Sequence, residues 1–171
     1  MLAANVPRPL AAEMSRSDDP FEPGPFTARR MSAPHDAYHR RFVDVMQGHM
    51  GASGGEAMER MYRAQCLKDD TMAEAIADHL RLHAHRRPLV VHLNGKFHSD
   101  HGHGTVQRVV ERMPGVTVGL VSMLAVEEPT EHEPTRLELG RANFLFLVKP
   151  PKKEKEVKKN EEDRKRADGT E

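Results

Sequence analysis

The sequence has too few cysteines for the disulfides of small secreted domains, and it shows no long apolar run of the kind that spans a membrane. Its 171 residues include one cysteine and no tryptophan, and only 5% are aromatic. A single cysteine, Cys66, excludes an internal disulfide and is expected to be an inert, half-buried thiol. Apolar residues make up 37% of the chain and the mean hydropathy is -0.68, so the core must be confined to part of it. The apolar residues 1–4 stop at Asn5, and we find neither a signal peptide nor a transmembrane run.

The chain also lacks an excess of either charge. Lysine plus arginine and aspartate plus glutamate each number 26, so no net charge draws the chain to nucleic acid or to an anionic membrane. We therefore expect no nucleic-acid partner. What is abundant is histidine, with 11 residues, and methionine, with 10. At helical spacing the methionines indicate core filling rather than metal ligation.

The order of the hydrophobic patterns predicts an α/β fold. Helices are expected at 34–50, 56–85 and 105–113, the last with Thr105 as a cap, and buried strands at 88–94, 116–124 and 142–148. Residues 1–8 look like a strand end that runs into a turn. This alternation favours one domain, residues 1–149, with a mostly parallel sheet. Irregular connections are expected at 15–34, 48–55 and 127–140, and a disordered Lys/Glu-rich tail at 150–171.

Two polar residues lie in the middle of the apolar face of the helix predicted at 56–85. At about 100° per residue, Gln65 and Asp69 share one stripe with Met58, Tyr62, Met72, Ala73, Ile76 and Leu80. The opposite face, which carries Asp70, is expected to be solvated. An unpartnered buried polar group costs about 1–3 kcal/mol. Gln65 and Asp69 must therefore either bond a neighbouring loop or line a ligand site.

The loop after the strand predicted at 88–94 holds further candidate ligands. Ligands of open α/β sheets bind beyond the carboxyl ends of the strands, where Gly95 would let backbone come close and His98 could reach back. The run 98–103 offers imidazole and carboxylate groups that suit zinc, iron or manganese. His101 and His103 are more simply interpreted as exposed loop residues, and His92 as a core histidine.

Arg8 and Tyr62 complete the candidate set. Arg8 follows the first predicted strand end and could pair with Asp69 in a salt bridge, or with an anionic ligand group such as a propionate. Tyr62 is the only tyrosine on the inward stripe. Its phenolate could ligate a ferric haem, although such a tyrosine more often packs and hydrogen-bonds.

Three stretches in sequence order resemble one family. They are Ala3-Ala-Asn-Val-Pro-Arg8, Tyr62-x-Ala-Gln-x-x-Lys-Asp-x-Thr-Met-Ala73 and Val90-Val-His-Leu-Asn-Gly-Lys-Phe-His98. Together they resemble the ChaN-like haem-binding uptake proteins, which share a superfamily with the Tiki proteases, the TraB proteins and the erythromycin esterases. The resemblance covers residues 1–149.

The resemblance implies a three-layer α/β/α fold that binds haem as a homodimer, with the haem between the subunits. It also implies a role in bacterial iron uptake, as a membrane-anchored lipoprotein or in the periplasm. The haem-binding candidates are then His98, Gly95, Gln65, Asp69, Arg8 and Tyr62, and His98 is also the candidate metal ligand. A divalent metal is the alternative cofactor.

The family's early strand, ending in Gly-Glu-x-His, is not found before Ala3, so we expect an N-terminally truncated domain. One alternative function is a metal-dependent hydrolase of the Tiki or erythromycin-esterase type. For that chemistry this chain supplies His98 and Asp69 but not the early glutamate and histidine. The other alternative is an inactive remnant.

Overall fold

The computed structural model describes residues 3–50 and 55–151. The helices are α1 (Arg8–Met14), α2 (Ala37–Met50), α3 (Gly55–Leu82), α4 (Thr105–Arg112) and α5 (Arg136–Leu139), and the strands are β1 (Val121–Ala125) and β2 (Phe144–Val148). Short 3₁₀ turns lie at η1 (Ala84–Arg86), η2 (Lys96–His98) and η3 (Asp100–Gly102). The helices predicted at 34–50, 56–85 and 105–113 are confirmed, with shifted ends. Residues 48–50 of the predicted link end α2 and residue 55 begins α3, whereas 51–54 and most of the predicted tail, residues 152–171, lie outside the described residues.

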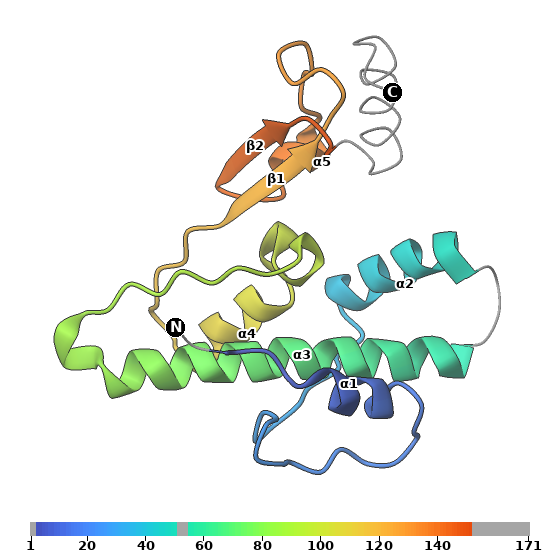
Figure 1. The fold of residues 1–171 in the computed structure, drawn as a ribbon, viewed down its shortest axis with the longest axis vertical. Coiled ribbons are helices and arrows are strands. Elements are labelled where there is room, and N and C mark those ends of the chain that lie inside the picture. The colour runs from blue at the N-terminus through green and yellow to red at the C-terminus, as the bar shows by residue number, and fades with distance from the viewer. Residues whose placement is uncertain (1–2, 51–54, 152–171) are drawn as a thin grey trace, which may run out of the picture.

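Helix α3 is the axis on which α1, α2 and α4 pack. Figure 1 shows it running across the molecule, with α2 and α4 on one side and α1 on the other. The consecutive residues from Asp69 to Ala73 are all buried, and such a run covers more than a full turn, so the middle of α3 has no exposed face. The prediction that Asp70 lies on a solvated face is therefore wrong, since its exposure is 2%.

Each of three hydrophobic clusters joins α3 to a different neighbour: α2, the α1 segment or α4. Their buried members are, in that order, Tyr38, Phe42, Met58, Tyr62 and Cys66; Val6, Ala11 and Leu67; and Ala73, Ile76 and Val109. Fully burying one large apolar side chain contributes about 1.5–3 kcal/mol. A core wrapped around one helix needs few such side chains, which agrees with the low apolar content.

The connection at 15–34 has no regular secondary structure, as predicted, but polar side chains of α3 hold it in place. The Ala28 N–H donates to Thr71 Oγ1 at 3.1 Å. The Ser32 N–H donates to Asp70 Oδ2 at 2.9 Å. These bonds satisfy backbone groups that the loop cannot pair within itself.

Strands β1 and β2 form a two-stranded parallel sheet, in register from Val121 opposite Phe144 to Ala125 opposite Val148. Helix α5 lies in the connection between them and starts with a capping box, in which Thr135 and Glu138 bond each other's backbone. The predicted parallel pairing is confirmed. The strand predicted at 116–124 begins only at Val121, and the one predicted at 142–148 begins at Phe144.

Residues 88–94 do not form the predicted buried strand. Within residues 3–50 and 55–151 only β1 and β2 pair, so this segment has no sheet partner. Leu89, Val91 and Leu93 are 77–89% exposed, whereas Val90 packs against the cluster shared by α3 and α4. The apolar run thus covers the helices with one side only, and nothing among the described residues covers the other.

The three-layer α/β/α architecture is not confirmed. The described residues form a group of helices with a small parallel sheet beside it (Figure 1). Residues 3–7 are not the expected strand end, and Arg8 begins α1 instead. Pro9 lies in the first turn of this helix, where its fixed φ favours helix initiation and its missing N–H costs nothing.

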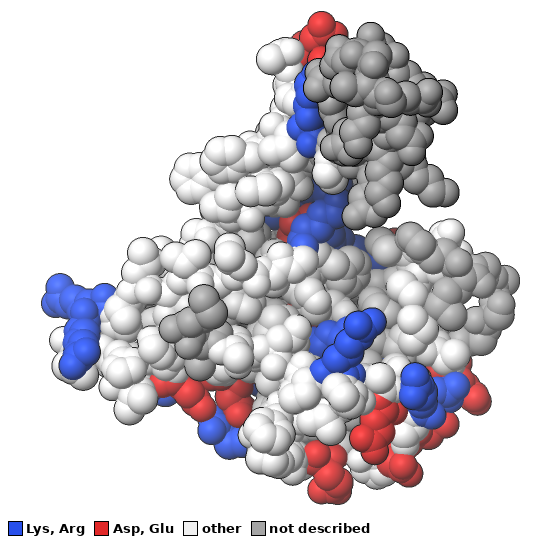
Figure 2. Space-filling model, viewed as in Figure 1, with Lys and Arg blue, Asp and Glu red and all other residues white. Residues whose placement is uncertain are grey.

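The surface of the described residues carries mixed charge. Figure 2 shows acidic and basic side chains interleaved along the lower edge of the molecule, with no broad area of one sign in this view. This distribution agrees with the equal numbers of acidic and basic residues. Among the described residues, no helix is both long enough and apolar enough to cross a membrane.

Candidate functional site

Asp69 is the centre of a buried polar cluster in the middle of α3. The residue is 0% exposed, and Tyr38 from α2 donates its O–H to Oδ2 at 2.7 Å. The Thr105 hydroxyl at the start of α4 donates to Oδ1 at 2.8 Å. His98 Nδ1 lies 2.8 Å from the same oxygen. Charge-assisted hydrogen bonds of this kind compensate a carboxylate for its removal from water.

Gln65, one helical turn before Asp69, joins this cluster. Its Nε2 donates to the Tyr38 hydroxyl at 3.0 Å and lies 3.0 Å from His98 Nδ1. Burial and the neighbouring Asp69 carboxylate raise the pKa of Tyr38, so its phenol stays protonated and acts as a donor. The predicted meeting of Gln65, Asp69 and His98 is therefore present in the structure.

The η2 turn brings His98 to α3. Its neighbour Phe97 packs against Tyr38 and Phe42, with ring centroids 5.3 and 6.0 Å apart. Gly95 precedes the turn with φ -67° and ψ 138°, which any residue adopts, and a Cβ added there would meet His98 Cδ2 at 3.9 Å. The close approach expected at Gly95 is therefore not seen.

Gly104 is the glycine that the cluster requires, and sequence reasoning missed it. Its φ is +57°, and an added Cβ would lie 2.6 Å from the His98 carbonyl oxygen and 2.9 Å from Asp69 Oδ1. Gly104, not Thr105, occupies the N-cap position of α4. Thr105 does not cap the helix because its hydroxyl bonds Asp69 instead. The run Gly-His-Gly-Thr before a helix was the only available signal.

Arg8 and Tyr62 are not brought to His98. Arg8 is exposed on α1, which packs on the other side of α3, and the described hydrogen-bond partners of the Asp69 carboxylate are Tyr38, His98 and Thr105. Tyr62 is 0% exposed and donates its O–H to the Pro34 carbonyl oxygen at 2.8 Å. Burial raises the pKa of Tyr62, which opposes formation of a phenolate.

His92 lies beside this cluster. Its Nε2 is buried and, within the described part of the chain, has no hydrogen-bond partner. Burial, together with the nearby His98, lowers the pKa of His92, so its ring is neutral at pH 7.

An open cleft of about 480 Å³ lies between the start of α2 and α4, and its lining includes Ala37, His103 and Val106. The ring of His103 lies against that of Tyr38, a member of the cluster, with centroids 6.1 Å apart.

Asp100 forms a second buried polar group, which connects the sheet to the helices. It is 0% exposed and accepts a hydrogen bond from Ser122 of β1 at 2.7 Å. Arg41 of α2 and Arg141 before β2 approach its Oδ2 at 3.5 and 3.4 Å. Asp100 in the run 98–103 is therefore a structural carboxylate and not a metal ligand.

The alternative hypothesis of a metal-dependent hydrolase gains no support from this region. Among the described residues, three side chains are placed so that they could hold a metal ion, and neither His98 nor Asp69 is one of them.

Comparison with known proteins agrees with the sequence resemblance. The model of the family described as "Haem-binding uptake, Tiki superfamily, ChaN" matches residues 1–109, which include all the side chains of the Asp69 cluster. Searches of curated proteins and of solved structures found no match. Since the family match spans well over half of the chain, this chain belongs to the ChaN family of haem-binding uptake proteins in the Tiki superfamily.

Proposed function

We propose that this chain binds haem at the Asp69 cluster, with His98 as the iron-coordinating residue. The observation that carries the proposal is the 2.8 Å contact between Asp69 Oδ1 and His98 Nδ1. A carboxylate at that distance holds the proton on Nδ1 and makes Nε2 the nitrogen that can bind a metal ion. Imidazole ligands of metals are oriented and made more basic by such a carboxylate, and histidine is a common axial ligand of haem.

The residues around His98 offer further groups that could help to hold haem. His92 Nε2, which has no hydrogen-bond partner among the residues that the structure describes, offers a second neutral imidazole nitrogen near His98. Gln65 Nε2 lies 3.4 Å from His98 Nε2, so this amide covers the nitrogen and must turn aside when a ligand binds. Haem would supply an iron centre for binding or redox chemistry, and these residues would hold and orient it. Gly95, Arg8 and Tyr62 lie outside the set on which the proposal depends.

Titration of the purified chain with hemin tests the proposal through the Soret band. The intact chain should give a saturable shift, and His98→Ala should weaken binding by about tenfold or more, since it removes the iron ligand. His103→Ala removes a half-buried histidine later in the same loop and should leave the titration unchanged. Asp69→Asn should weaken binding by about 10–100-fold, because the imidazole loses its carboxylate partner.

Circular dichroism of each variant separates loss of a ligand from loss of fold. If His98→Ala and the parent chain titrate alike while both are folded, His98 is not the ligand. If the intact chain shows no saturable change, haem binding by this chain is itself rejected.

The proposal extends to haem handling during iron uptake and to a homodimer. Leu89, Val91 and Leu93 present exposed apolar side chains, which supports self-association. Light scattering of the chain with and without hemin should give the mass of a dimer in at least one state. A monomer in both states would reject the dimer but not the role of His98.

A further inference from the structure

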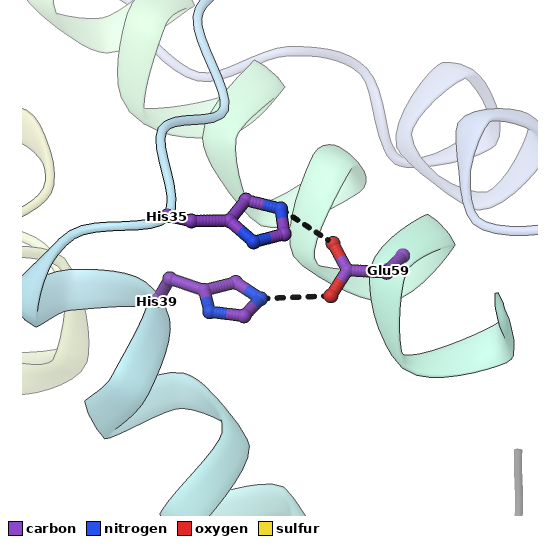
Figure 3. A group of neighbouring side chains, drawn as sticks. All are labelled: His35, His39 and Glu59. Atoms are coloured by element: carbon purple, nitrogen blue, oxygen red, sulfur yellow. Dashed lines mark hydrogen bonds and ion pairs between the residues drawn. The ribbon is translucent and has the colours of Figure 1, made fainter. Parts of the chain in front are cut away.

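A second group of possible ligands lies away from the Asp69 cluster, at the amino end of α2. Figure 3 shows the rings of His35 and His39 stacked and directed at the Glu59 carboxylate. The ring centroids are 4.1 Å apart and the planes are inclined by 12°. His35 Nε2 lies 3.2 Å from Glu59 Oε2, and His39 Nε2 lies 2.8 Å from Oε1. We infer that His35, His39 and Glu59 bind a divalent transition-metal ion of the zinc class.

The geometry suits such an ion. One nitrogen or oxygen from each residue can be chosen so that all three atoms lie within 4.8 Å of one another. Zinc binds histidine nitrogen and carboxylate oxygen at about 2.0–2.2 Å in tetrahedral geometry, which puts two ligand atoms on the same ion about 3.3–3.6 Å apart. The observed separations of 2.8 and 3.2 Å are slightly shorter, so a small outward shift of the side chains would admit the ion. Two imidazoles and one carboxylate leave further coordination positions open to water.

Tyr62 fixes the ring of His39 and the backbone just before His35. The ring of His39 meets Tyr62 edge-on, with centroids 4.6 Å apart. The Tyr62 hydroxyl bonds the carbonyl oxygen of Pro34, the residue before His35. The Asp36 carboxylate accepts the backbone N–H groups of Tyr38 and His39 and so caps α2 between the histidines. This support reduces the ordering that metal binding requires.

The exposures of the three side chains allow the ion to enter. Those of His35 and Glu59 are 68% and 42% exposed, and that of His39 is 14% exposed. His35 can therefore adjust its position by a small rotation while His39 stays in place. An ion bound at these nitrogens would replace the contacts of the two histidines with Glu59. Because only deprotonated imidazole binds a metal ion, binding should weaken as the pH falls.

Titration of the untagged full chain with Co²⁺, followed by its visible absorption bands, and with Zn²⁺, followed by calorimetry, tests this site. We expect one saturable site. His35→Ala and Glu59→Gln should each weaken binding by at least about tenfold, because loss even of an outer partner costs 10–100-fold in metal affinity. Both side chains are largely exposed, so the variants should fold.

His83→Ala is the matched control. His83 lies against His79, four residues before it, with ring centroids 4.5 Å apart and the planes inclined by 59°, but among the described residues this pair belongs to no three-ligand group. The control should bind like the parent, as should His98→Ala, which makes the result independent of the haem proposal. If His35→Ala and Glu59→Gln titrate like His83→Ala, the three residues do not form a metal site.

Discussion

At the scale of single residues, the Asp69 cluster depends on positions where only one side chain suits the space. Asp69 needs donors on both of its oxygens, and Tyr38, His98 and Thr105 supply them. Gly104 lets the backbone of the loop come against Asp69. Cys66, in the hydrophobic cluster shared by α2 and α3, is fully buried, and burial raises the pKa of its thiol to about 12. The expectation of an inert thiol agrees with this environment, although the side chain is buried rather than half-buried.

Gly104→Ala should destabilise the chain by about 2–4 kcal/mol. The added Cβ would adopt a strained φ and lie 2.6 Å from a backbone oxygen that cannot easily move. Urea denaturation measures this change in the free energy of unfolding.

Two other glycines separate the causes of that loss. Gly102 also has a positive φ, +73°, but open space around it, so Gly102→Ala should cost only about 1–2 kcal/mol. Gly95→Ala meets neither strain nor close contact and should be neutral or stabilising by up to about 1 kcal/mol. Equal effects at all three positions would contradict the steric account of Gly104.

At the scale of elements, α3 and α4 are joined by a buried ion pair as well as by apolar contact. Asp70 Oδ2 lies 3.1 Å from Arg108 Nε, and Asp70 Oδ1 lies 2.6 Å from Arg112 Nη2. Arg108 also donates to the Ser32 carbonyl oxygen at 2.8 Å, so the same group holds the loop before α2. Burial of a charged pair is tolerated here because each partner keeps several hydrogen bonds.

Asp70→Asn should destabilise the chain by about 3–5 kcal/mol, because it leaves the buried Arg108 guanidinium without a counter-charge. Chemical denaturation gives the value. Asp78→Asn is the comparison, since Asp78 pairs with Arg29 on the surface at 2.8 Å with side chains 42% and 67% exposed. That change should cost less than about 1 kcal/mol. A similar cost for both substitutions would show that burial does not decide the strength of the Asp70 pair.

At the scale of the whole molecule, one loop connects helices α2 and α3 to the sheet. Residues 92–105 carry His98 and Thr105 to α3 and carry Asp100 to the sheet and to Arg41 of α2. The backbone adds a further link, since His101 N–H donates to the Arg141 carbonyl oxygen at 2.7 Å. The orientation of the sheet against the helices therefore depends on the same loop that presents His98.

The folded chain should lose stability as the pH falls below about 6.5, the ordinary pKa of histidine. Burial lowers the pKa of His92, with His98 adding to the effect, and burial together with Arg41 lowers the pKa values of His101 and His103. Below pH 6.5 the unfolded chain therefore binds more protons than the folded chain, and stability decreases toward the lowered pKa values.

Thermal unfolding between pH 5 and pH 8 checks this expectation. The double variant His101→Asn, His103→Asn should show a weaker pH dependence than the parent. His85→Asn removes an exposed histidine and should leave the dependence as it is. An unchanged slope in the double variant would mean that other groups set the acid limit.

Elements with a local pattern could be predicted from the chain alone. The 3.6-residue period predicted α3 and placed Gln65 and Asp69 on its inward stripe, and three short motifs indicated the family. Four other features became visible only in the folded molecule: the burial of Asp70, the lack of a described sheet partner for 88–94, the bond from Thr105 to Asp69, and the meeting of His35, His39 and Glu59. The physical reason is that periodicity reports which face of one element is apolar. Pairing between Asp69 and His98, or between Asp70 and Arg108, depends on how separate elements pack, and no local pattern encodes it.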